Sequence, residues 1–193
     1  MAWVSTSPLV KTYTLEEFWE LPETPDHSKL ELIAGVLYMT PPPTQLHNNS
    51  VNRLSRLLFE YQFKSGDKGT IYHPRAGIIK GPNSWLEPDI FYVTDEANTR
   101  RDPKYPNYLA TADLVIEVIS PGSAIYDRNT KADTYAALGV KELWLVDEAS
   151  GIIEVRVLKG DSYGPSIVLE SEDLLRSTVL AGFEVRVGNV FGV

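Results

Sequence analysis

The chain has 193 residues, 43% of them hydrophobic and 23% charged, and it contains no cysteine. We expect one compact domain over residues 1–193, without disulfides, thiolate zinc sites or a membrane-spanning run. The N-terminus lacks the pattern of a signal peptide, so the expected location is the cytoplasm. The formal net charge of −8 disfavours a general nucleic-acid coat protein, because phosphate binding depends on Lys and Arg. A carboxylate metal site would add negative charge of its own.

The N-terminal third predicts a helix, a hairpin and a longer helix. Thr14 and Glu17 have the spacing of a capping box, which starts a helix over residues 14–21. Residues 29–39 are expected to form a hairpin that turns at Ala34-Gly35. After the stiff Pro41-Pro42-Pro43 segment, apolar residues recur at steps of three and four, and they predict a helix over residues 44–61.

The rest of the chain alternates strands with one helix. The run at 114–119, LVIEVI, is the most apolar short segment and predicts a central strand buried on both faces. A strand–helix–strand crossover is expected from there to residue 146, which gives an α+β fold with a mixed sheet flanked by helices. The other expected segments are strands at 70–80, 89–93, 143–146 and 152–158, an exposed loop at 98–106, a helix at 127–138 that Gly139 stops, and a β-rich end at 167–193.

Glu117 lies inside the apolar run, where a carboxylate costs several kcal/mol unless it is paired or bound to metal. Alternatively, strand alternation turns Glu117 to solvent, or an arginine pairs with it. Asp89 opens the strand at 89–93 and can reach the same edge of the sheet. Two converging carboxylates need a cation between them, and oxygen ligands favour Mg²⁺ or Mn²⁺. Asp89 could also simply cap a turn.

Asp127, Lys131 and Tyr135 are four residues apart, so they share one face of the predicted helix. This spacing favours an exposed Asp–Lys pair; the functional alternative directs Lys131 toward the metal, where it would stabilise a pentavalent phosphate. Glu31 in the hairpin and His47 at a helix start are further candidates. Taken alone, each is more often a surface residue, although a helix N-terminus favours anions.

Several of these segments together resemble one family. The segments are KLELIAGVL at residues 29–37, PPP at 41–43 with His47, EPDI at 87–90, ADLVIEVISP at 112–121, and the stretch from Asp127 to Asp147. They are similar to the Uma-two family of restriction endonuclease-like proteins, over about residues 15–158. The block from Asp113 to Asp147 is the specific part of the resemblance.

The resemblance implies the PD-(D/E)xK nuclease fold, with a mixed central sheet flanked by helices. It implies that Asp89 and Glu117, with the backbone carbonyl of Val118, hold the metal, and that Glu31 completes the site. The motif expects a lysine two residues after Glu117, where this chain has Ile119. The resemblance therefore implies that Lys131 supplies that lysine from the helix.

The sequence then predicts an Mg²⁺- or Mn²⁺-dependent endonuclease acting on nucleic acid, with DNA as the expected substrate. His47, Tyr135 and Arg128 are the expected substrate-binding residues, and Arg100, Arg101 and Lys104 are further candidates for phosphate contacts. A homodimer is one expected state, since cutting two strands needs two sites.

Two alternatives remain open at this point. The first is a catalytically silent nuclease fold that binds nucleic acid or a partner, and a basic groove over Asp89 and Glu117 would test it. The second is an interaction protein in which Glu117 is exposed or paired with arginine, far from Asp89. In that case Trp85, Trp144, Tyr105 and Tyr108 would form a patch for another subunit.

Overall fold

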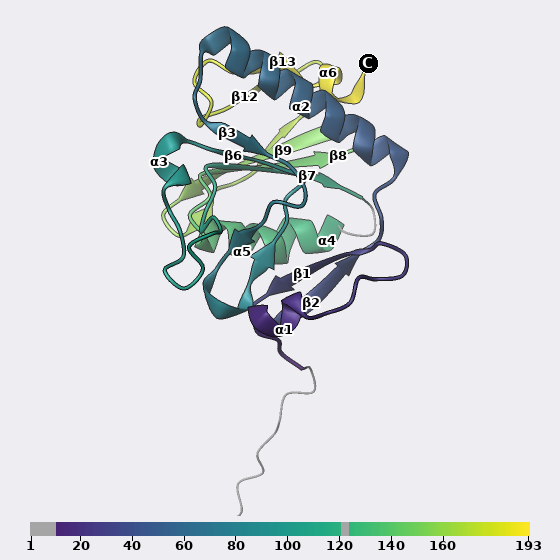
Figure 1. Ribbon diagram of the computed structural model, residues 1–193. Helices are drawn as coiled ribbons and strands as arrows, with labels where there is room; N and C mark the ends of the chain where they lie inside the picture. The colour runs from purple at the N-terminus through teal and green to yellow at the C-terminus, as the bar shows by residue number, and fades with distance from the viewer. Residues whose placement is uncertain (1–10, 121–123) are drawn as a thin grey trace, which may run out of the picture.

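The computed structural model describes residues 11–120 and 124–193. A seven-stranded mixed sheet forms the centre of the molecule, and a smaller four-stranded sheet lies beside it (Figure 1). The large sheet has the order β10-β9-β8-β7-β6-β3, with β11 also paired to β9. Its strands are β3 (Thr70–Tyr72), β6 (Ile90–Val93), β7 (Leu114–Ile119), β8 (Glu142–Asp147), β9 (Ile152–Lys159), β10 (Ser162–Tyr163) and β11 (Ile167–Leu169).

The small sheet has the order β2-β1-β5-β4 and contains the expected hairpin. Its strands are β1 (Lys29–Ile33), β2 (Val36–Thr40), β4 (Ile78–Ile79) and β5 (Trp85–Leu86). The hairpin turns at Ala34-Gly35, and both residues have positive φ. A further pair, β12 (Leu174–Arg176) with β13 (Glu184–Arg186), lies near the C-terminus.

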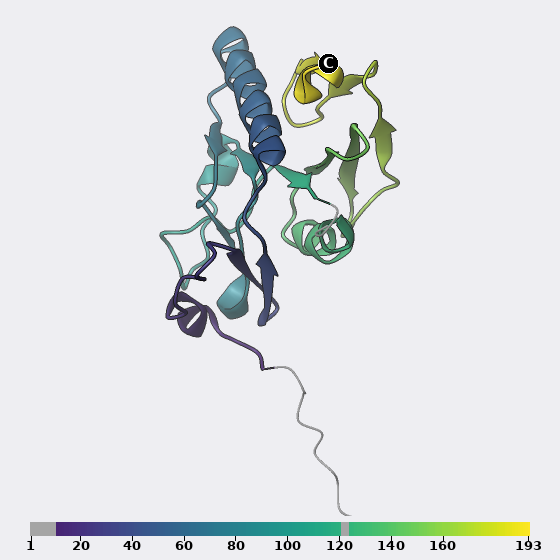
Figure 2. The ribbon, with the colours of Figure 1, turned by 90° about the vertical axis from the view of Figure 1, so that its right-hand side faces the viewer.

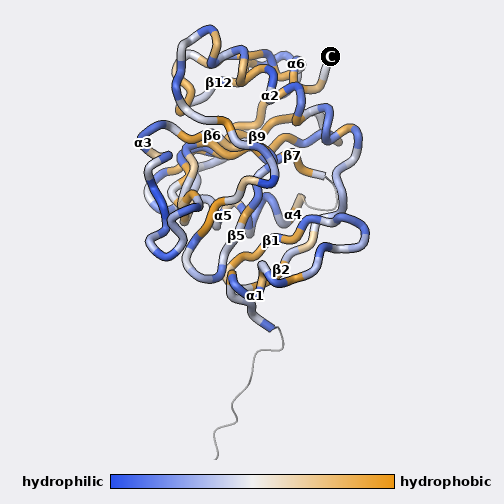
Figure 3. Tube along the Cα trace, viewed as in Figure 1, coloured by the Kyte–Doolittle hydropathy of each residue, from blue (hydrophilic) through white to orange (hydrophobic). Residues whose placement is uncertain are grey.

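Helices cover both faces of the large sheet, as the side view in Figure 2 shows. On one face lie α2 (Gln45–Ser65) and the C-terminal segment with α6 (Gly188–Phe191); on the other lies a helix in three parts, α4 (Ala124–Tyr126), η2 (Asp127–Lys131) and α5 (Ala132–Ala137). The remaining helices are α1 (Leu15–Trp19), η1 (Gly81–Asn83) and α3 (Asp95–Asn98). The hydrophobic residues concentrate in the central strands (Figure 3).

Strand β7 has a core on each side. Ile116 and Val118 pack toward α2, whereas Val115 and Ile119 pack toward α5. Strand alternation therefore directs Glu117 to the α5 face. β7 pairs in parallel with β8 and antiparallel with β6, so the predicted crossover and the mixed sheet are both confirmed.

Several local predictions are confirmed. Thr14 and Glu17 form the capping box, although α1 ends earlier than expected. Thr44 caps α2, which continues to Ser65 before Gly66 stops it in the left-handed conformation.

The single strand predicted at 70–80 is wrong. The segment divides into β3 and β4, which belong to different sheets. Between them, Pro74 cannot donate to a ladder, and a Cβ on Gly77 would lie 2.3 Å from the ring of Trp85. Gly77 therefore allows the ring of Trp85, from the neighbouring strand β5 of the small sheet, to lie against the backbone just before β4. No helix in the described part of the chain is long and apolar enough to cross a membrane.

Candidate functional site

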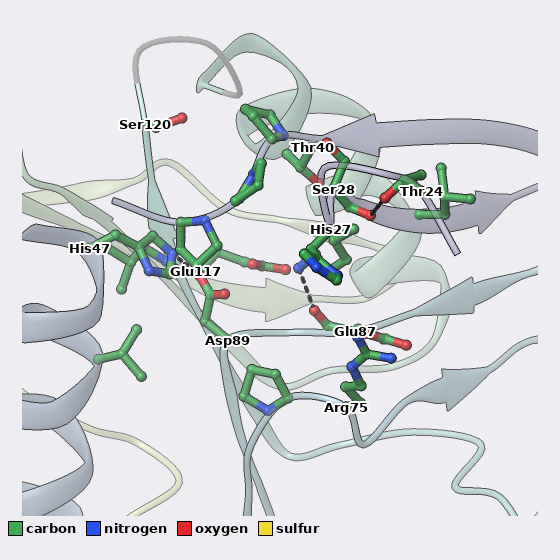
Figure 4. Close-up of a pocket in the computed structure, with 18 of the residues that line it drawn as sticks. Thr24, His27, Ser28, Thr40, His47, Arg75, Glu87, Asp89, Glu117 and Ser120 are labelled. Carbon is green, nitrogen blue, oxygen red and sulfur yellow. Dashed lines mark hydrogen bonds and ion pairs between the residues drawn. The ribbon is translucent and has the colours of Figure 1, made fainter. Parts of the chain in front are cut away.

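A pocket of about 570 Å³ opens at the ends of β6 and β7, against the β1–β2 hairpin and the start of α2. Figure 4 shows Asp89 and Glu117 in its centre, with His47 on one side and Glu87 and Arg75 on the other. Five of the predicted site residues line it, namely His47, Asp89, Glu117, Val118 and Lys131, and so does Asp127. The pocket therefore brings together most of the site that the sequence predicts.

Glu117 is 3% exposed and receives two hydrogen bonds on the same oxygen. The Lys131 ammonium donates to Oε1 at 2.9 Å, and the Tyr135 hydroxyl donates to it at 2.5 Å. Both donors come from the helix that covers this face of β7. Glu117 is thus neither solvated nor paired with an arginine, and its carboxylate is held by the helix.

Lys131 comes from η2, a π-helical turn that interrupts the helix between α4 and α5. π-helical turns often occur at functional sites. The ammonium is 2.9 Å from Oε2 of Glu31 and 3.6 Å from Oδ1 of Asp127, in addition to Glu117. Lys131 is 2% exposed, so the expectation of a solvated Asp–Lys pair is wrong. Three carboxylates share this one buried ammonium.

Glu31 is fully buried in β1 and connects the small sheet to this cluster. Its Oε1 accepts the backbone N–H of Glu87 at 2.9 Å, and its Oε2 forms the ion pair with Lys131. Lys29, two residues before it, lies 4.0 Å from Oε1 and donates to the carbonyl of Glu87 at 2.8 Å. These contacts explain why a carboxylate is stable at this buried position. Glu31 does not line the pocket and contacts it through Lys131 and Glu87.

Asp89 is held from two sides. Its Oδ2 lies 3.0 Å from Nε2 of His47, at the start of α2, and accepts the backbone N–H of Val118 at 2.9 Å. The Thr44 hydroxyl accepts the backbone N–H of His47, so the cap that starts α2 also fixes the backbone from which the imidazole extends. Asp89 is 7% exposed and does more than cap a turn.

Burial and neighbouring charges shift the pKa values of these groups. Burial raises the pKa of Glu117 to about 7, against the opposing charge of Lys131. Burial alone would lower the pKa of Lys131, but Glu117, Glu31 and Asp127 outweigh it and hold that pKa well above its usual value. Lys131 is therefore a cation and not a general base.

The His47–Asp89 pair shows the same balance. Burial disfavours the charge on His47, but the hydrogen bond and charge of Asp89 outweigh it and raise the pKa of the imidazole. For Asp89, burial raises the pKa, while His47, Lys29 and Lys131 together bring it below its usual value. The carboxylate is thereby kept ionised.

The donor chemistry fits a hard divalent cation. The hydrogen bonds of Asp89 all end on Oδ2 and those of Glu117 on Oε1, so within the described residues Oδ1 of Asp89 and Oε2 of Glu117 have none. Among the described residues, no group of three or more His, Cys, Asp or Glu side chains is arranged to hold a metal ion without further ligands. Mg²⁺ is often bound by one or two carboxylates with waters and phosphate, a mode that these two oxygens can serve.

Two predicted substrate-binding residues lie elsewhere. Tyr135 is fully buried behind Glu117, so it cannot touch a substrate and instead orients the carboxylate. Arg128, within the π turn, does not line the pocket, and Asp147 and Glu154 bind its guanidinium at 2.7 and 2.6 Å. The predicted spacing correctly places Tyr135 on the same face as Lys131, but spacing alone could not reveal that this face is buried or that Arg128 binds Asp147 and Glu154.

The basic loop predicted for phosphate contacts also lies outside the pocket. Arg100 pairs with Glu96, and Lys104 pairs with Glu16. Lys29, which lines the pocket, was not predicted. Lys29 precedes Glu31 by two positions on one strand, so alternation could have placed it on the same face.

The alternative of an interaction patch built on the aromatic residues does not fit the structure. Trp144 is fully buried, and Trp85 and Tyr105 are 7% and 8% exposed, so these rings belong to the core. Glu117 is buried and lies close enough to Asp89 for the Asp89 charge to raise its pKa. Both features contradict the reading in which the two carboxylates are separate surface groups.

The fold matches a solved structure, and the sequence matches the model of one protein family. A crystal structure titled as a "putative nuclease belonging to DUF820" from Anabaena variabilis ATCC 29413 superposes with a TM-score of 0.75, at 20% identity, covering 93% of this chain and 98% of that one. At that identity the likeness shows the shared α+β fold. No curated protein sequence is significantly similar to the chain. The model of the Uma2 family, described as "Putative restriction endonuclease", matches residues 15–188, and the chain therefore belongs to the Uma2 family.

Proposed function

We propose that this protein is a divalent-metal-dependent endonuclease that hydrolyses phosphodiester bonds in nucleic acid, with DNA as the expected substrate. The single observation that carries the proposal is the Lys131 ammonium 2.9 Å from Glu117, in a pocket that Asp89 also lines. A carboxylate pair with an adjacent lysine supplies the ligands and the positive charge that phosphodiester hydrolysis requires. Membership of the Uma2 family supports the same activity.

Asp89 and Glu117 would hold Mg²⁺ or Mn²⁺ through Oδ1 and Oε2. When bound, the metal would polarise the phosphate and lower the pKa of a water. Lys131 would stabilise the negative charge that develops on the phosphate, because its pKa is held high. Glu31 would position Lys131, Tyr135 would orient Glu117, and His47 would orient Asp89.

One observation favours a second candidate function. Lys131 already neutralises part of the charge on Glu117 and Glu31, as a bound cation would. A catalytically silent nuclease fold that binds nucleic acid is consistent with this internal ion pair. Metal binding separates the two functions, because only the endonuclease needs it.

The test combines Mn²⁺ calorimetry with Mg²⁺-dependent cleavage of labelled DNA, on wild type, Glu117→Gln and Asp89→Asn. Glu60→Gln on the exposed surface of α2 is the matched control. We expect cleavage that EDTA abolishes and that both site variants reduce on the order of 100-fold, with weaker Mn²⁺ binding. Nucleic-acid binding without cleavage or metal binding in wild type would instead support the silent fold.

A further inference from the structure

The pocket extends well beyond the carboxylates and has an apolar wall. Phe18 and Trp19 from α1, Leu21 and Pro22 after it, and the segment Pro41-Pro42-Pro43 after β2 supply this wall. Trp19 is 41% exposed, and Tyr108 supports its ring in a stacked arrangement with centroids 5.5 Å apart. A large aromatic side chain that is held in place yet open to the pocket is suited to stacking on a flat ligand.

The cations of the pocket are few and mostly engaged. Lys131 is bound by the three carboxylates, and Lys29 donates to the carbonyl of Glu87. Arg75, at the outer end of the pocket (Figure 4), is 3.5 Å from Glu23, with which it forms an exposed ion pair. The three cations are thus dispersed among carboxylates, and the described lining of the pocket has no continuous basic track.

This distribution of charge disfavours a duplex. Proteins that grip double-stranded DNA derive much of their affinity from many Lys and Arg contacts along both backbones. The net charge here is −8, and Arg100 and Lys104 of the basic loop pair with glutamates outside the pocket. Recognition of single strands draws in addition on stacking of splayed bases against aromatic side chains, a contact that the paired bases of a duplex cannot make.

We propose that the pocket takes one unpaired nucleotide of a single-stranded nucleic acid, with its base against the apolar wall and its phosphate beside Lys131 and the divalent cation that Asp89 and Glu117 would hold. The volume of about 570 Å³ lies in the range of pockets that enclose a small ligand. The inference rests on the proposed function in taking nucleic acid as the substrate. It adds that the substrate is a single strand, and that the base of the bound nucleotide packs against the apolar wall around Trp19.

The test measures binding by fluorescence anisotropy with three labelled probes. These are single-stranded oligothymidine, the same strand paired with oligoadenosine, and single-stranded oligouridine. Ca²⁺ replaces Mg²⁺, and gels verify that the strands stay intact. The variants are Trp19→Ser, the conservative Trp19→Phe, and Leu21→Ser as a second change in the wall. Phe63→Ser is the control, because Phe63 is an aromatic residue on α2 that is 92% exposed and does not line the pocket. Thermal melting confirms that each variant is folded.

We expect the single strand to bind at least about tenfold tighter than the duplex, and Trp19→Ser to weaken it about tenfold while Trp19→Phe and Phe63→Ser leave it nearly unchanged. Tighter binding of oligouridine than of oligothymidine would support the inference and assign RNA as the strand. The inference would be overturned if the duplex bound as tightly as the single strand. It would also be overturned if neither Trp19→Ser nor Leu21→Ser weakened binding of the single strand. Mg²⁺-dependent cleavage of duplexes alone would overturn this inference while leaving the proposed function intact.

Discussion

The ammonium of Lys131 lies 2.9 Å from Oε1 of Glu117, although the two residues are fourteen positions apart on different elements. Ile119, where the family motif expects the lysine, is 2% exposed and packs in the core on the same face of β7. The helix that covers that face delivers the lysine instead. This position of Lys131 supports our proposal that it supplies, from the helix, the charge that the family motif places after Glu117 on the strand.

Lys131→Met should destabilise the protein strongly, because Glu31 and Glu117 would lose their shared buried cation. Removing one partner of a buried pair typically costs about 3–5 kcal/mol of the free energy of unfolding. Urea denaturation measures this loss. Lys64→Met, at an exposed position of α2, should change the same quantity by only about 0.5 kcal/mol or less. A comparable small loss for Lys131→Met would mean that the cluster is not formed in solution.

Tyr135→Phe removes the hydroxyl that donates to Glu117 at 2.5 Å. We expect a loss of about 1.5–3 kcal/mol in unfolding free energy, because the acceptor is a buried carboxylate. The variant should also bind Mn²⁺ about 10–100-fold more weakly, since Glu117 loses an orienting partner. Calorimetry beside Tyr61→Phe, whose hydroxyl bonds an exposed carbonyl, checks both effects. Unchanged metal affinity would show that Lys131 alone orients Glu117.

Much of the fold could be predicted because its signals are local. The capping box at Thr14, the cap at Thr44 with the apolar spacing of α2, and the apolar run of β7 each specify their element within a few residues. The division of residues 70–80 between two sheets could not be predicted, since it depends on β3 pairing with β6 and β4 pairing with β5. Only the tertiary structure determines which strands these two short segments meet.

The candidate site was predictable in part for the same reason. A carboxylate inside an apolar strand is costly, so Glu117 indicates a partner before the partner is known. The four-residue spacing placed Asp127, Lys131 and Tyr135 on one face correctly, but it could not show that this face is buried against Glu117 and Glu31. Nor could it show that Arg128 binds Asp147 and Glu154.

Arg128→Ala should therefore affect stability and leave substrate binding unchanged. The guanidinium donates to Asp147 and Glu154, and losing hydrogen bonds between charged groups costs about 1.5–3 kcal/mol. Urea denaturation should show this loss, while anisotropy with labelled oligonucleotides should match wild type. Arg56→Ala, on the exposed side of α2, controls for the change in net charge. A selective loss of oligonucleotide affinity in Arg128→Ala would place this residue at the substrate after all.

Asp113 should make the stability of the protein depend on acid pH. The carboxylate is 1% exposed; it accepts the N–H and the hydroxyl of Thr94 and pairs with Lys141 at 2.7 Å. Burial raises the pKa of Asp113, but these partners outweigh it and hold the pKa below its usual value. A group whose folded pKa is depressed stabilises the protein above its unfolded pKa, and this contribution disappears as the pH falls through the folded pKa.

The difference in unfolding free energy between wild type and Asp113→Asn isolates this contribution, because other carboxylates titrate in both proteins. We expect wild type to be the more stable at pH 7, and the difference to shrink as the pH is lowered below about 4, the usual range of an aspartate. Asp161→Asn, at an exposed position, should show no such pH-dependent difference. A difference that stayed constant from pH 7 to strongly acid conditions would mean that Asp113 is not charged when it binds Thr94 and Lys141.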